Sequence, residues 1–114
     1  MPHCIIEYTP NSAIAVSELV TTAHQVMIDS GLFDTAAIKT RAHAVNDYVL
    51  GASAPQQSDF IHIIIRLLDG RTMAQKQALT SSMAKTLRTH LPTVASITVD
   101  IVDMLRETYA KDVV

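Results

Sequence analysis

The sequence has no tryptophan and a single cysteine among its 114 residues. One cysteine cannot form an internal disulfide, and the strand-like flanks of Cys4 favour a buried structural thiol over a catalytic one. No apolar run approaches the ~20 residues of a membrane span. No basic stretch followed by an apolar one indicates a signal peptide at the N-terminus. We therefore expect a protein of the reducing cytoplasm that has no membrane partner.

Positive charge is scarce and scattered. Nine Lys and Arg residues stand against eleven Asp and Glu residues, which leaves a net charge of −2. The basic residues form no cluster or stripe along the chain, so nucleic acid is not an expected partner. The histidines lack the spacing of metal ligands, and we expect no metal site; they are His3, His24, His43, His62 and His90.

Apolar side chains, by contrast, are abundant. Hydrophobic residues make up 48% of the chain and charged residues 18%, which is typical of a globular protein. The length fits a single domain, residues 1–114, that is long enough to bury a core. The apolar share is high for so small a chain, and it indicates an additional surface buried between subunits.

The first half of the chain, about residues 1–58, has the pattern strand, helix, strand. His3–Tyr8 is predicted as a short strand, and turn residues follow it. A helix is predicted from about residue 13, with Gly31 as its left-handed C-terminal cap. Residues 36–48 alternate as a second strand, and a small-residue loop over 51–58 follows. The apolar face of the helix is predicted to hold Val16, Leu19, Val20, Ala23 and Met27.

The second half, about residues 59–114, repeats this order. The stretch DFIHIIIRLL is the clearest strand, with one wholly apolar face made by Ile61, Ile63, Ile65 and Leu67. Thr72 and Gln75 form a capping box that starts a helix. The helix buries Leu79, Met83, Leu87 and Leu91, and Pro92 stops it. The methionines, Met73 included, are expected in the apolar helix stripes. The stretch SITVDIVDM alternates as a fourth strand.

These elements predict an α/β fold of two β-α-β units that form a four-stranded mixed sheet with both helices on one face. The other face of the sheet then has no cover. It includes Val45, Phe60, Ile64 and Leu68, an apolar surface that indicates an interface. A closed cyclic oligomer would cover this face.

Pro2 has two interpretations. A proline has no amide hydrogen for a sheet, so it fits the first residue of a strand. Alternatively, removal of Met1 leaves Pro2 with a free secondary amine. An α-amine has a pKa near ~8, and burial beside cations lowers this pKa toward the range of a good general base. The residues alone leave both interpretations open.

Three basic residues are candidates for binding anions. Arg71 lies directly before the second helix, where it either pairs with Asp69 or solvent, or holds an anion together with the helix N-terminus. Lys39 and Arg41 share a face of the second strand. They form either a solvated strand face or a cationic wall for a substrate carboxylate.

Four stretches carry a resemblance to a known family: PHCIIEY, SGLF, KTRAHAVNDY and FIHIIIRLLDGRT. The sequence resembles the tautomerase superfamily, and within it most closely the 5-carboxymethyl-2-hydroxymuconate isomerases. The resemblance implies a homotrimer, no cofactor, Pro2 as the catalytic base, and substrate binding by Arg71, Arg41 and Lys39. It also implies a role in bacterial homoprotocatechuate catabolism. Lys39 departs from the pattern, because arginine is expected there.

Two other functions remain open on the same fold. One is a different activity of the superfamily, such as that of a decarboxylase or a dehalogenase. The other is a non-catalytic, trimeric binding module. The isomerase hypothesis predicts that a 2-hydroxymuconate-type dienoic acid, 5-carboxymethyl-2-hydroxymuconate, is converted to its 2-oxo tautomer.

Overall fold

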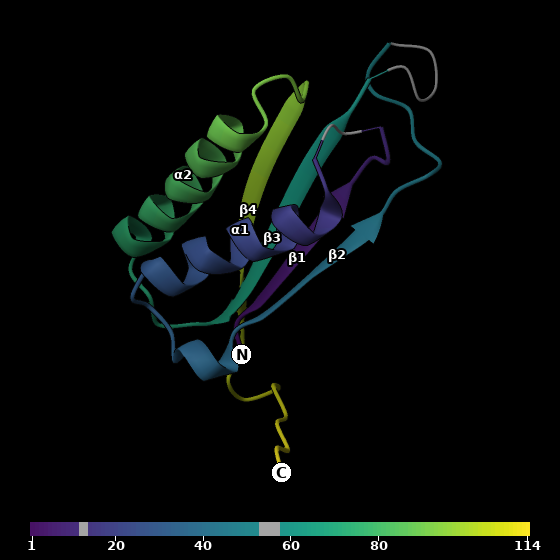
Figure 1. Cartoon of the computed structure of the whole chain (residues 1–114). Coiled ribbons are helices and arrows are strands. Elements are labelled where there is room, and N and C mark those ends of the chain that lie inside the picture. The colour runs from purple at the N-terminus through teal and green to yellow at the C-terminus, as the bar shows by residue number, and fades with distance from the viewer. Residues whose placement is uncertain (12–13, 53–57) are drawn as a thin grey trace.

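The computed structural model describes residues 1–11, 14–52 and 58–114, and its described strands form one mixed sheet (Figure 1). The strands are β1 (His3–Tyr8), β2 (Lys39–Ala44), β3 (Phe60–Leu68) and β4 (Ser96–Met104), in the order β2-β1-β3-β4. β1 runs parallel to β2 and antiparallel to β3, and β3 runs parallel to β4. Consequently β1 and β2 begin at the same edge of the sheet at which β3 and β4 end. We call this the N-terminal edge.

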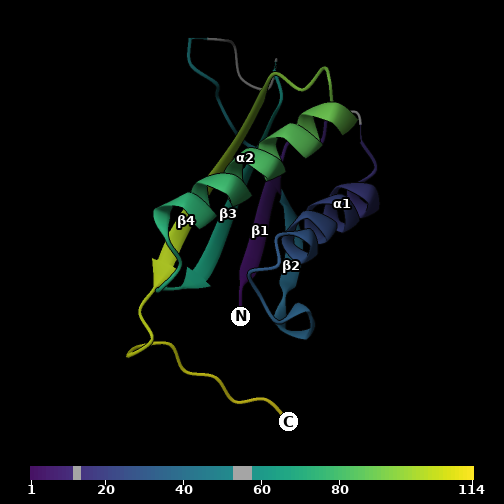
Figure 2. The ribbon, with the colours of Figure 1, turned by 90° about the vertical axis from the view of Figure 1, so that its left-hand side faces the viewer.

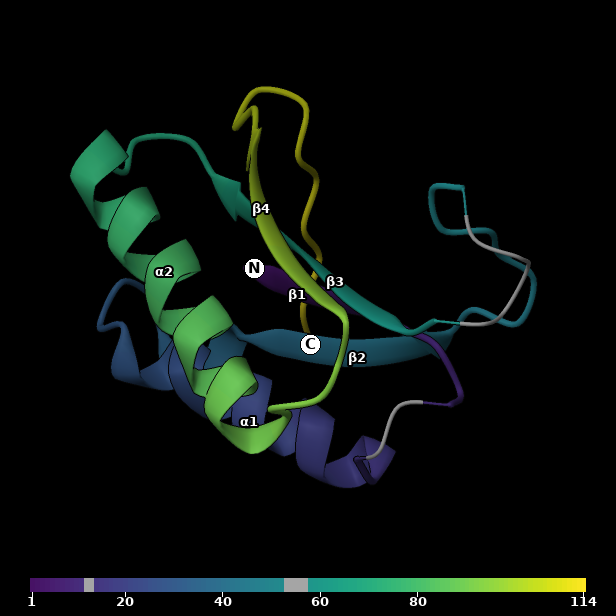
Figure 3. The same cartoon turned by 90° about the horizontal axis from the view of Figure 1, so that it is seen from above.

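Two helices connect the parallel strands and cover one face of the sheet (Figure 3). Helix α1 (Val16–Asp29) joins β1 to β2, and α2 (Met73–His90) joins β3 to β4. The predicted capping box of α2 is confirmed: the Thr72 hydroxyl accepts from the Gln75 amide at 3.1 Å, and the Gln75 side chain accepts from the Thr72 amide at 2.8 Å. Gly31 follows α1 with φ +68°, as the C-terminal cap requires.

The core lies between the helices and the sheet. Alternation on β1 and β3 places every second side chain under the helices, where hydrophobic burial stabilises the fold. The apolar faces predicted for β3 and α2 are confirmed. Fully buried residues of the core include Cys4, Ile6, Leu19, Ala23, Met27, Ile61, Ile63, Ile65, Leu67, Met83 and Leu87.

Three details of the predicted elements were wrong. The second strand is Lys39–Ala44 rather than residues 36–48, and it starts later because Thr35–Ala37 forms a 3-10 turn in which the Asp34 carboxylate accepts from the Ala36 amide at 3.2 Å. Val16 is 39% exposed at the start of α1 rather than in the core. Met73, which was expected in an apolar helix stripe, is 66% exposed. The predicted loop over 51–58 lies largely outside the described residues.

The sheet face opposite the helices, which we call the open face, carries Phe60, Ile64 and Leu68 as half-buried side chains. No described helix of this subunit covers them; Phe60 contacts the Tyr48 ring edge to face, with centroids 5.6 Å apart. The chain after β4, residues 105–114, runs past the N-terminal edge (Figures 1 and 2). It is attached there by an ion pair between Arg106 and Asp69 at 3.2 Å.

Candidate active site at the N-terminal edge

The start of the chain lies in an environment that disfavours positive charge. The Met1 amine donates a hydrogen bond to the carbonyl of Ala37 at 2.6 Å. Pro2 is buried, and its carbonyl accepts from the Lys39 amide at 3.0 Å. Burial, then the charge of Lys39 and a hydrogen bond with it, then the charge of Lys111, lower the pKa of the Met1 amine from 8.0 to about 6, while Asp34 acts in the opposite direction. The Met1 amine is therefore mostly neutral near pH 7.

Lys39 and Arg41 lie side by side along β2 on the open face, as predicted. Lys39 pairs with His3 of β1 in the sheet register, and Arg41 pairs with Ile5. The Lys39 ammonium donates to the Ala37 carbonyl at 3.3 Å, so it shares this acceptor with the Met1 amine. Arg41 Nη1 lies 3.1 Å from His3 Nδ1. Both cations are exposed, and so are accessible to an anionic ligand.

Arg71 is held by backbone carbonyls and by an aromatic ring. Its guanidinium donates to the carbonyls of Leu68 at 3.1 Å and Leu32 at 2.8 Å, and it lies 5.0 Å from the centre of the Phe33 ring. It does not pair with Asp69, because that carboxylate binds Arg106. Arg71 thus joins the segment after α1 to the end of β3.

The same guanidinium lines a polar cleft of about 310 Å³. The other lining residues are Gly31, Leu32, Gly70, Gln75 and Arg106. Among the described residues, no hydrogen bond or ion pair links Arg71 to Pro2, Lys39 or Arg41. Within one subunit the structure therefore brings Pro2 and Lys39 together at the N-terminal edge and joins Arg41 to His3, while Arg71 is fixed by a separate set of contacts.

The sequence of the chain matches one known protein family. The sequence profile of the 5-carboxymethyl-2-hydroxymuconate isomerase family matches residues 2–106. The chain belongs to this family. No curated protein sequence matches the chain. Membership supports an isomerase or tautomerase type of activity.

Solved structures share the fold of this family member. A 5-carboxymethyl-2-hydroxymuconate isomerase from Deinococcus radiodurans R1 is 21% identical, with a TM-score of 0.86 over 97% of this chain and 88% of that one. A fused 4-OT symmetric trimer is 13% identical, with a TM-score of 0.79 over 96% and 90%. FG41 malonate semialdehyde decarboxylase, inhibited by 3-bromopropiolate, is 13% identical, with a TM-score of 0.72 over 96% and 88%. These likenesses establish the tautomerase fold predicted from the sequence.

Sequence reasoning missed two neighbours of this edge. Tyr109 places its hydroxyl 3.1 Å from His3 Nε2, and Lys111 contributes to the lowered pKa of the amine. His3 had one signal in the sequence, because alternation along the first strand puts it on the face opposite Cys4 and Ile6. Tyr109 and Lys111 had none, because they follow the last predicted strand.

Other groups of this family member are poor candidates for chemistry. Cys4 is fully buried, and burial raises the pKa of its thiol to about 12, which confirms a structural thiol. In residues 1–11, 14–52 and 58–114, no three His, Cys, Asp or Glu side chains are grouped to hold a metal ion. None of the described helices is both long and apolar enough to cross a membrane.

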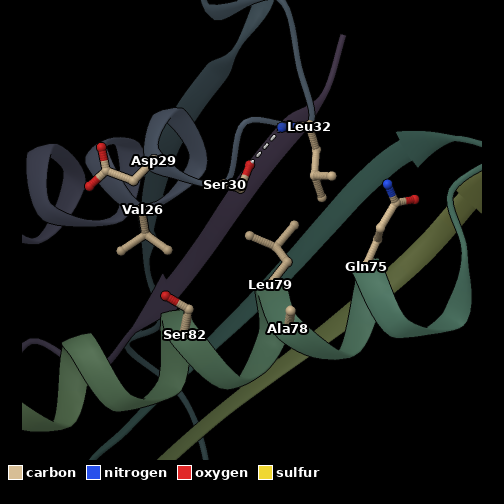
Figure 4. Close-up of a pocket in the computed structure, with 8 residues that line it drawn as sticks. All are labelled: Val26, Asp29, Ser30, Leu32, Gln75, Ala78, Leu79 and Ser82. Atoms are coloured by element: carbon tan, nitrogen blue, oxygen red, sulfur yellow. Dashed lines mark hydrogen bonds between the residues drawn. The ribbon is translucent and has the colours of Figure 1, made fainter.

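A second cavity lies between the two helices (Figure 4). It has a volume of about 310 Å³, and Val26 and Leu79 form much of its apolar wall. Asp29 is its one ionisable lining residue, beside Ser30, Leu32, Gln75, Ala78 and Ser82. A lone carboxylate without a basic partner gives no means to bind and deprotonate an anionic substrate, so we assign the candidate site to the N-terminal edge.

Proposed function

We propose that the chain, once Met1 is removed, converts a 2-hydroxymuconate-type dienoic acid to its 2-oxo tautomer, with Pro2 as general base. The observation that carries this proposal is the place of Pro2, buried at the start of β1 and bonded to the backbone of Lys39, in a member of this isomerase family. Removal of Met1 transfers the free amine to Pro2, whose carbonyl is already fixed by the Lys39 amide. An amine that is neutral near pH 7 can accept a proton without first losing one.

The proposed reaction is a proton transfer within the substrate. The Pro2 nitrogen takes the proton of the 2-hydroxyl group, and the electron pair of that O–H bond forms the 2-oxo group. The double bonds shift, and the nitrogen returns the proton to carbon 5. The product is the conjugated 2-oxo acid, and the amine is neutral again. No oxidant, reductant or co-reactant is consumed.

The reaction also needs positive charge, because the substrate carries carboxylates and develops negative charge on its 2-oxygen. The cations of the site supply it. We assign carboxylate binding to Arg41 and Lys39 at the N-terminal edge, and to Arg71. Lys39 is a point charge rather than a planar fork, so it favours charge neutralisation over bidentate orientation. Its ammonium is held by the Ala37 carbonyl, close to the amine.

The proposed assembly is a homotrimer in which the open faces pack around the axis. The half-buried Phe60, Ile64 and Leu68 support a covering partner. A homotrimer also permits Arg71 of one subunit to act with Pro2 of another. The fused 4-OT neighbour is itself a symmetric trimer.

The decisive experiment compares the Met-free protein with the Met1-retaining protein, and intact mass identifies the two forms. We expect the Met-free form to tautomerise 5-carboxymethyl-2-hydroxymuconate, with a basic limb below the pKa of an ordinary α-amine. We expect the Met1-retaining form to fold and to lack this activity, since its Pro2 nitrogen is an amide. Pro2→Ala, which keeps a primary amine, should retain part of the activity.

Equal turnover by the two forms would exclude Pro2 as the base and leave it as a strand-start residue. Turnover of neither form would favour the binding module. Release of carbon dioxide from a 3-oxo acid such as malonate semialdehyde, without tautomerisation, would favour a decarboxylase.

A further inference from the structure

The C-terminal segment, residues 105–114, continues from the end of β4 past the N-terminal edge (Figure 2). The Tyr109 hydroxyl lies 3.1 Å from His3 Nε2, and the two rings meet edge to face with centroids 6.2 Å apart. Lys111 lowers the pKa of the Met1 amine through its charge. The family profile ends at residue 106, so both side chains lie beyond the part of the chain that it matches.

Hydrogen-bond chemistry fixes the direction of this contact. Arg41 Nη1 lies 3.1 Å from His3 Nδ1, and a guanidinium can only donate. His3 Nδ1 must therefore accept, which puts the single ring proton of a neutral imidazole on Nε2. His3 Nε2 then donates to the Tyr109 oxygen. The chain of donors runs from Arg41 through His3 to Tyr109.

The surroundings keep His3 neutral, as this chain of donors requires. Burial first, and then neighbouring positive charge, lower the pKa of His3 below its usual 6.5. The basic groups near the ring come from both neighbouring strands and the chain start: Arg41, the N-terminal amine, Lys39 and Arg66. Protonation would place a second donor against Arg41 and break their hydrogen bond.

We propose that His3 and Tyr109 are positioning residues that hold the Arg41 guanidinium in place for an anionic substrate. The proposal rests on the proposed function, because it takes Arg41 as a carboxylate-binding residue. An exposed arginine loses rotamer freedom when it binds a ligand. Arg41 has lost part of that freedom already, because His3 accepts from its guanidinium and Tyr109 fixes the His3 ring.

The kinetic test is Tyr109→Phe, which removes the hydroxyl and keeps the ring against His3. Tyr48→Phe is a matched control, because Tyr48 also has an edge-to-face ring partner, Phe60, and donates to the Ser58 carbonyl at 2.6 Å. We expect Tyr109→Phe to raise KM about threefold to tenfold with kcat nearly unchanged, as for the loss of one hydrogen bond used in binding. We expect no change for Tyr48→Phe. Equal KM values for the two variants would overturn the proposal.

A second readout does not depend on turnover. The nitrogen-15 NMR shifts of His3 should show the Nε2–H tautomer in the Met-free protein at pH 7, and Arg41→Ala should give a mixture of tautomers. An Nδ1–H tautomer or an imidazolium in the unmodified protein would overturn the proposal.

If the protein lacks tautomerase activity, KM cannot be measured. The dissociation constant of malonate, measured from the nitrogen-15 NMR shifts of the His3 ring, is then compared between the variants instead. The expected result is again a threefold to tenfold weakening in Tyr109→Phe alone. Equal malonate affinity in the two tyrosine variants would overturn the positioning role. Failure of the proposed function and failure of this inference are thus separable.

Discussion

The two faces of the sheet are built from the same strands and have different contents. On β3, Ile63 is fully buried beneath the helices, while its neighbour Ile64 is half-buried on the open face. On β1, Cys4 and Ile6 are fully buried, whereas His3 on the opposite face contacts Arg41 and Tyr109. The covered positions of β3 from Ile61 to Leu67 are all aliphatic, whereas its open positions include His62 and Arg66.

This difference shows how one strand serves both the fold and the site. Side chains alternate between faces, so a single step along the chain moves a residue from the core to the candidate interface. The covered face carries the hydrophobic energy of the fold. The open face is left to bind a partner, a substrate or both. Variants at neighbouring positions can separate these two tasks.

The largest effect is expected from Ile64→Lys. An unpaired cation in the proposed interface is strongly unfavourable, by several kcal/mol per copy. Light scattering should show that the homotrimer is lost, and circular dichroism should show that the subunit keeps its helices, because Ile64 lies outside the helix-covered core. An unchanged trimer would contradict the assignment of the open face as the interface.

A smaller but still large effect is expected from Ile63→Ala, one residue away. Removing this buried side chain should lower the free energy of unfolding by about 2–5 kcal/mol in urea denaturation. The matched variant Ile64→Ala should cost less in the subunit, and its cost should depend on protein concentration through assembly. Equal, concentration-independent costs would remove the distinction between the two faces.

Arg71→Ala should lower kcat/KM about tenfold to a thousandfold, as for the loss of a charge-assisted pair with substrate. Arg71→Lys should restore only part of the rate. Arg88 is a matched control, because its guanidinium also donates to backbone carbonyls, including that of Val94 at 2.6 Å. Arg88→Ala should therefore lower stability and leave kcat/KM unchanged. If the two alanine variants have the same kcat/KM, Arg71 only holds the Leu32 and Leu68 segments together and does not bind substrate.

The smallest effect concerns the amine of the Met1-retaining protein. Because its pKa falls from 8.0 to about 6, acylation of this amine should be half-maximal near pH 6. The folded form then binds fewer protons than the unfolded form between about pH 6 and 8, so stability should rise with pH across this window. Lys39→Ala should move the acylation midpoint upward only in part, since burial is the larger cause. A midpoint near pH 8 in both proteins would contradict this account.

The covered face could be predicted from the sequence because its signals are local. Alternation from Ile61 to Leu67 identified β3, and the Thr72 and Gln75 capping box marked the start of α2. The start of β2 could not be predicted, because Thr35–Ala37 has only small side chains and no pattern that separates a 3-10 turn from a strand.

Contacts of the candidate site were harder to predict, since they join distant segments. Tyr109 and His3 are 106 positions apart in the chain. The acceptors of Arg71 are the carbonyls of Leu68 and Leu32, and a backbone carbonyl has no side-chain signature in the sequence. Sequence alone identified Pro2, Lys39, Arg41 and Arg71 as candidates but gave no indication of what holds each of them.

The hydrogen bond from Met1 to Ala37 has a consequence for when the protein matures. A processing enzyme needs the first residues extended and free, whereas folding half-buries Met1 and bonds its amine. The bond forms only after Ala37 has been synthesised and the β1–β2 pair has closed. At ~5–20 residues per second, a ribosome needs on the order of seconds to make that segment. Under the proposed function, trimming and folding therefore compete on the nascent chain, and subunits that fold first would keep Met1 and remain without a catalytic base.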